Sequence, residues 1–77
     1  MIAFAAEPLT RQLPTCAEQR WPSVCGRWAI LEIATDYGRR PRKEKILLVR
    51  CLTVGEYVVG RFRCRRHAIR KARELDV

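Results

Sequence analysis

The fold of this chain is decided by one stretch, Val59-Gly60-Arg61-Phe62-Arg63-Cys64-Arg65-Arg66-His67-Ala68-Ile69-Arg70-Lys71-Ala72-Arg73. It begins at the end of an expected strand, passes through a Cys-x-x-His pair and enters a segment with a helical period. In that segment the apolar residues recur on one side, and Arg66, Arg70 and Arg73 line the opposite side. Arg65 falls towards the apolar side. The period therefore predicts an amphipathic C-terminal helix, from residue 65 to residue 75, with a basic outer face.

The length limits the chain to one small domain. A chain of 77 residues seldom builds a core worth more than about 3–5 kcal/mol, so a disulfide, a metal or a partner usually adds stability. The apolar run at residues 2–6 stops at Glu7-Pro8, which is too short for a secretory signal, and no apolar run approaches the roughly 18 residues of a membrane span. We therefore expect a protein of the reducing cytoplasm, where cysteines are more often metal ligands than disulfide partners.

The net charge of +8 is unevenly distributed. Residues 1–26 contain two basic and two acidic side chains, whereas residues 27–77 contain the other 14 basic and 6 acidic ones. The whole excess of positive charge thus lies in the second part of the chain. This imbalance favours a polyanionic partner, although it says nothing about the fold.

The first 15 residues show neither the helical nor the strand period, and they contain two prolines. They also carry five large apolar side chains, which is more than a solvated tail usually has. Two interpretations stay open: a partly ordered tail, or a docking segment for a partner or for this domain's own sheet. Residues 16–77 are expected to form the folded domain.

Three segments have the composition of strands. Residues 28–35 are apolar and β-branched enough for a mostly buried strand, and residues 45–54 and 57–63 form an expected hairpin. The dipeptide Gly55-Glu56 is interpreted as its two-residue turn. Residues 39–45, between the first strand and the hairpin, are strongly basic and fit either a solvated loop or a binding loop.

The expected turn also predicts a register for the hairpin. It places Cys51 opposite Gly60 and Arg50 opposite Arg61, with Phe62 on the core side. Two like charges directly opposite each other are unfavourable unless water or an anion separates them, so this pair suggests an anion-binding surface.

Four residues are predicted to bind one Zn²⁺: Cys16, Cys25, Cys64 and His67. Cys64 and His67 stand at i and i+3, which lets both point at one ion from the first helical turn. The predicted register separates Cys51 from Cys64 by roughly 13 Å, whereas two sulfurs on one zinc lie within roughly 4 Å. Cys51 is therefore interpreted as a small buried residue. Four protein ligands make the site structural rather than catalytic. A Cys16–Cys25 disulfide, a surface role for His67, and Cys51 in place of Cys16 remain alternatives.

These residues carry a resemblance. A knuckle ending in Cys25-Gly26-Arg27, a hairpin, and a helix beginning Cys64-Arg65-Arg66-His67-Ala68 resemble the treble-clef and zinc-ribbon-like fingers. More narrowly, they are similar to small Cys-Gly-Arg … Cys-x-x-His-Ala proteins encoded by actinobacteria and their phages. The similarity covers roughly residues 16–75. This chain departs from the pattern in its Cys-x8-Cys spacing and in having Trp28 where such proteins often have proline. It implies binding of DNA, RNA or protein.

Pattern and resemblance together predict an α+β fold: a small zinc-stabilised domain with a metal knuckle, an antiparallel three-stranded sheet or hairpin, and a C-terminal helix. The leading functional hypothesis is nucleic-acid binding, mainly through phosphate contacts. Its candidate residues share a positive charge and are Arg39, Arg40, Arg42, Lys43, Arg50, Arg61, Arg63, Arg66, Arg70, Lys71 and Arg73. The alternative is a protein-interaction module, for example a phage-type accessory or host-directed protein that docks on a larger assembly. It would dock through the apolar N-terminal segment and the outer sheet face, whose apolar side chains are expected to be Leu48, Leu52, Val54, Tyr57 and Val59. The residues of an enzyme active site are not recognisable, so we do not expect an enzyme.

Overall fold

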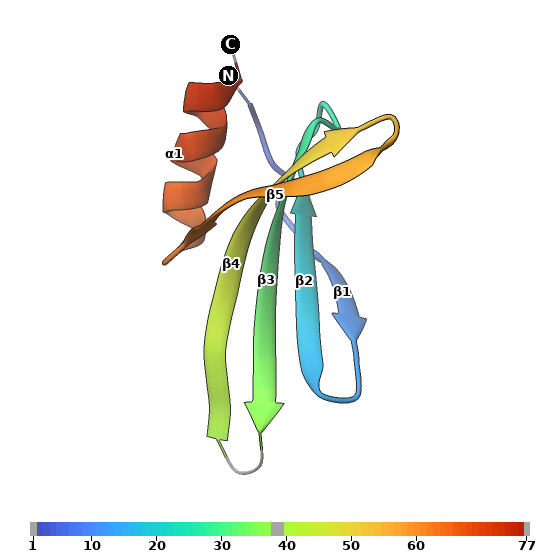
Figure 1. Ribbon diagram of the computed structural model, residues 1–77, viewed down its shortest axis with the longest axis vertical. Helices are drawn as coiled ribbons and strands as arrows, with labels where there is room; N and C mark the ends of the chain where they lie inside the picture. The colour runs from blue at the N-terminus through green and yellow to red at the C-terminus, as the bar shows by residue number, and fades with distance from the viewer. Residues whose placement is uncertain (1, 38–39, 77) are drawn as a thin grey trace.

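The computed structural model describes residues 2–37 and 40–76, and for residues 35–37 and 40–44 it describes the backbone only. The elements are β1 (Leu9–Gln12), β2 (Cys16–Pro22), β3 (Trp28–Tyr37), β4 (Arg40–Leu52), β5 (Gly55–Phe62) and α1 (Arg65–Leu75). The strands form one antiparallel sheet in the order β1-β2-β3-β4-β5, so each strand pairs with its neighbours in the chain. Helix α1 lies beside this sheet (Figure 1).

The predicted zinc-knuckle fold with a three-stranded sheet or hairpin is wrong, because the sheet has five strands. Strand β1 lies in the expected tail, and β2 occupies most of the expected Cys-x8-Cys loop. Both strands escaped the sequence pattern because β1 is exposed throughout and all but one residue of β2 are half-buried, so neither shows a clean apolar alternation. The predicted C-terminal helix is confirmed at residues 65–75.

Strand β3 confirms the strand expected from residue 28 and continues to Tyr37. Strand β4 begins at Arg40, so the backbone of most of the basic segment is extended and paired rather than looped. Arg39, the first residue of that segment, lies outside the described residues. The long β3–β4 pair gives the domain its longest ladder.

The predicted hairpin exists, but its turn and register are wrong. The turn lies at Thr53 and Val54, and Leu52 pairs with Gly55, which has a φ of +150° and opens the next strand. Glycine tolerates such a backbone, so Gly55 does mark the turn region. It follows the turn, however, and is not the first residue of the turn as predicted. A register shift beside Leu48 leaves an extra residue in β5. The shift and the displaced turn together change every predicted pair.

The corrected register separates the two arginines that were expected to face each other. Arg50 pairs with Tyr57, and Arg61 pairs with Leu47. Leu47 and Arg50 are three positions apart on one strand, so they point to opposite faces of the sheet. The anion-binding pair expected at residues 50 and 61 is therefore absent.

The core lies between α1 and one face of the sheet. Its buried members are Ile2, Trp21, Trp28, Ile30, Ile46, Leu48, Ala68 and Ala72. The two helical residues are alanines with no exposed surface, and their small side chains let the helix backbone approach the strands closely. The N-terminal segment joins this core, since Phe4 forms a bridge with Ser23 and Ala5 N–H donates to the Pro22 carbonyl. It therefore docks on the domain's own sheet.

The end of the β4–β5 hairpin folds over the opposite face of the sheet, and β5 crosses the other strands at a steep angle (Figure 1). Arg20 on β2 reaches Glu56 on β5 with a 2.8 Å contact between Nη2 and Oε2. Two strands separate β2 from β5 in the sheet, so this ion pair requires a bent hairpin. The bend accounts for the burial of Ala29 and Val49 on the face away from the helix.

Leu48 offers a direct test of this core, because its side chain has no exposed surface. Leu48→Ala should lower the free energy of unfolding by about 2–5 kcal/mol, through lost burial and the cavity left behind. Urea denaturation followed by circular dichroism measures the change. Val58→Ala, at a site that is 55% exposed, is the matched control and should change stability by less than about 1 kcal/mol. Similar losses for both variants would contradict this packing.

Candidate nucleic-acid interface

The first turn of α1 is held by Trp21. The Cζ atom of Arg65 lies 4.2 Å from the centroid of the Trp21 ring, a cation–π contact. Trp21 is buried on the helix-covered face of β2. This contact orients the start of the helix and turns Arg65 towards the sheet.

The last turn of α1 is held by Trp28 and Arg27. Asp76, just after the helix, accepts a hydrogen bond from Trp28 Nε1 at 3.2 Å and pairs with Arg27 at 3.0 Å. The Trp28 hydrogen bond, with the charge of Arg27, lowers the pKa of the Asp76 carboxyl. Trp28 N–H in turn donates to Ser23 Oγ at 3.0 Å. The helix is thus fixed at both ends to the β2–β3 region.

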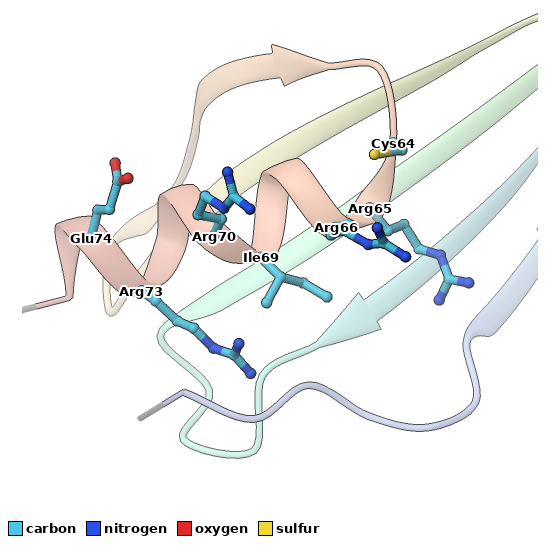
Figure 2. Close-up of a pocket in the computed structure, with 7 residues that line it drawn as sticks. All are labelled: Cys64, Arg65, Arg66, Ile69, Arg70, Arg73 and Glu74. Carbon is cyan, nitrogen blue, oxygen red and sulfur yellow. The ribbon is translucent and has the colours of Figure 1, made fainter.

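A hollow of about 900 Å³ lies along the exposed side of this fixed helix (Figure 2). Four of the seven residues that line it are arginines, and we call them the α1 arginine surface: Arg65, Arg66, Arg70 and Arg73. Half-buried Ile69 provides an apolar patch among them. In Figure 2 their side chains spread to both sides of the helix. The hollow therefore combines concentrated positive charge with a small apolar surface.

The α1 arginine surface has no carboxylate partners in the described part of the chain. Glu74 also lines the hollow, but it lies 3.6 Å from Lys71. Among the described residues, Glu56 and Asp76 pair with Arg20 and Arg27. Arg73 uses Nε to donate a hydrogen bond to the Ile2 carbonyl at 3.3 Å, which fixes the side chain without neutralising it. Unneutralised guanidinium groups on one surface are suited to binding phosphate oxygens.

The structure brings together only some of the predicted nucleic-acid-binding residues. Arg66, Arg70 and Arg73 line the hollow, and exposed Lys71 lies on the same helix. Arg63 is exposed in the link between β5 and α1, whereas Arg61 is exposed on the other face of the sheet. Arg39 lies outside the described residues, and the predicted residues Arg40, Arg42 and Lys43 belong to β4 with only their backbones described.

Arg50 lies apart from the α1 arginine surface. It is half-buried, its Cζ is 4.8 Å from the Trp28 ring centroid, and its Nη1 is buried with no hydrogen-bond partner among the described residues. Arg65, in contrast, was absent from the predicted set because the helical period puts it towards the apolar side. The available signal was the position of Arg65 at the apolar edge of the helix. An arginine there must lay its side chain along the core, where an aromatic ring is a suitable partner.

The four predicted zinc ligands do not come together. Cys16 begins β2 and Cys25 follows its end, so the seven residues of that strand separate them by roughly 20 Å. Cys64 precedes α1, whereas Cys25 shares a hollow with Asp76 at the other end of the helix. Within residues 2–37 and 40–76, no group of three or more His, Cys, Asp and Glu side chains is placed to hold a metal ion. The predicted set does not fit one tetrahedral site, and zinc stays a prediction.

The thiols of Cys25 and Cys51 occupy two different environments. Cys25 is exposed, and a hydrogen bond with Ser23 Oγ at 3.3 Å lowers the pKa of its thiol. Cys51 is half-buried beside Arg20 and Glu56, and burial raises the pKa of its thiol. These two thiols should therefore differ in nucleophilicity.

Comparison with known proteins finds no relative of this chain. No family model matches the chain, and neither a curated protein nor a solved structure shows significant similarity to it. These results leave the resemblance to small zinc fingers untested. Among the described residues, no helix has the length and apolar character needed to cross a membrane.

Cysteine modification tests this arrangement. With limiting iodoacetamide at neutral pH, Cys25 should be modified faster than Cys51, because Cys25 is exposed and more readily ionised. Peptide mass spectrometry reads the order, and the experiment is run with and without a metal chelator. The order should be the same in both. Joint protection of Cys16, Cys25 and Cys64 that a chelator relieves would contradict this arrangement and support the zinc prediction.

Proposed function

We propose that this protein binds nucleic acid through phosphate contacts made by the α1 arginine surface. The observation that carries the proposal is the group of four arginines that share one hollow and have no carboxylate partner among the described residues. A protein that needed these charges only for solubility would gain as much from lysine, whereas arginine offers a planar fork that matches phosphate oxygens.

The rest of the charge distribution supports the same proposal. The described ion pairs of Arg20 and Arg27 lie within the sheet and at the end of the helix, where they stabilise the fold. The helix surface keeps its positive charge in a chain whose net charge is +8. Phosphate contacts of this kind position a protein on a backbone and carry no sequence information, so binding should be sequence-tolerant and sensitive to salt.

The test is a salt titration with matched variants. Arg66→Ala and Arg70→Ala should each weaken binding to mixed-sequence oligonucleotides and reduce the slope of log K against log salt by about 1. Fluorescence anisotropy measures both quantities. Arg11→Ala removes the same charge from exposed strand β1 and should leave the slope nearly unchanged. A slope equally reduced in all three variants would show that net charge, rather than this surface, determines binding.

A second candidate function, docking on another protein, is favoured by the end of the β4–β5 hairpin. Its exposed apolar side chains are Leu52 (48%), Val54 (93%), Tyr57 (55%) and Val58 (55%). Large apolar side chains exposed at the end of a hairpin often mark an interaction surface, although Leu52 and Tyr57 lie on one face of this hairpin and Val58 on the other. Because this surface lies on a different element from α1, the two functions do not compete for the same residues.

Self-association is the simplest form of such docking to test. If the hairpin end binds apolar protein surface, Val54→Asp should raise the protein's solubility limit and abolish any concentration-dependent increase in mass seen by analytical ultracentrifugation. Val24→Asp is the control, since Val24 is 79% exposed but lies in the β2–β3 turn. A monomer whose solubility is the same in wild type and both variants would count against this candidate.

A further inference from the structure

Arg65 differs from the rest of the α1 arginine surface because its guanidinium already packs on an aromatic ring. The group lies over the Trp21 ring at 4.2 Å, and Trp21 is only 6% exposed. Arg65 itself is exposed and lines the hollow along the helix. The guanidinium is therefore anchored on Trp21 while the Arg65 side chain stays accessible from the hollow. A guanidinium plane held in this way can stack on a second flat group.

The residues next to Arg65 extend this platform. Half-buried Ile69 follows one helical turn later, and Arg73 follows after a second turn, fixed by its hydrogen bond to the Ile2 carbonyl. All three residues line the hollow of α1 and also a neighbouring hollow beside the N-terminal segment. Eight residues at a rise of about 1.5 Å place Arg65 and Arg73 about 12 Å apart along the helix. An apolar side chain thus lies between two oriented cations, which suits a flat base and its flanking phosphates.

We infer that the preferred ligand of this surface is a single-stranded nucleic acid, with one base stacked on the free face of the Arg65 guanidinium and phosphates bound by Arg66, Arg70 and Arg73. In a duplex both faces of a base are covered by its neighbours, whereas an unpaired base can be splayed out and stacked on an aromatic ring or an arginine plane. The inference rests on the proposed function and deepens it. Single-stranded DNA and RNA share this chemistry.

The test compares two substitutions that keep the charge. Arg65→Lys removes the stacking plane. Arg66→Lys makes the same chemical change in the same hollow, at a residue that packs on no aromatic ring in the described part of the chain. The probes are labelled oligodeoxythymidylate and oligouridylate of about 12 nucleotides, and a DNA duplex of the same length. Anisotropy should show that wild type prefers both single strands to the duplex. Arg65→Lys should lose about tenfold in single-strand affinity, Arg66→Lys should lose much less, and duplex binding should be the same for both.

Other outcomes separate this inference from the proposed function. Equal single-strand losses in the two variants, or tighter binding of the duplex by wild type, would overturn the stacking inference and leave phosphate binding standing. No binding of any probe by wild type would overturn both. Thermal unfolding verifies that both variants fold. If Arg65→Lys does not fold, ultraviolet cross-linking of the wild-type protein to the oligouridylate replaces the comparison of variants. Cross-links are expected in residues 64–69. Cross-links confined to other segments would refute the inference.

Discussion

The arrangement of this domain depends on two tryptophans that hold one helix at its two ends. Trp21 on β2 lies under Arg65 at the start of α1, and Trp28 on β3 donates a hydrogen bond to Asp76 just after its end. Both rings are buried on the same face of the sheet, where Ala68 and Ala72 bring the helix backbone close. An isolated helix of 11 residues is marginal in water, so its stability must come from this packing. This packing determines which side of the helix, and therefore which arginines, face away from the sheet.

These contacts also determine which charges are neutralised. Arg27 and Asp76 pair beside Trp28, and Arg20 and Glu56 pair where the β4–β5 hairpin folds over the sheet. Both pairs fix the bent sheet and the helix end. The hydrogen bond from Arg20 lowers the pKa of the Glu56 carboxyl, and the hydrogen bond from Trp28, with the charge of Arg27, lowers the pKa of the Asp76 carboxyl. These two carboxylates are thus used within the fold, whereas the arginines of the α1 arginine surface have no carboxylate partner among the described residues. A small basic domain can in this way be stable and still present a surface for a polyanion.

The errors of the sequence interpretation share a physical cause. The Cys-x8-Cys segment suggested a metal knuckle because cysteine spacing is visible in sequence, whereas the half-buried polar strand β2 shows no clear apolar alternation. Gly55 was correctly recognised as a special backbone position, but it follows the turn instead of forming it, and the bulge beside Leu48 changed the register again. A displacement of this kind moves side chains to the other face of a sheet, which is why Arg50 lies on Trp28 and Arg61 on the far face.

The sequence alone determined the C-terminal helix, its arginine-rich side, strand β3 and the presence of a hairpin, because local period and composition specify such elements. Only the tertiary structure decided that Cys16 and Cys25 lie at opposite ends of a strand, that the N-terminal segment docks on its own sheet, and that Arg65 lies over Trp21. Each of these depends on pairing between segments distant in the chain. Such pairing is selected by burial and strand register, which no local pattern in one sequence reveals.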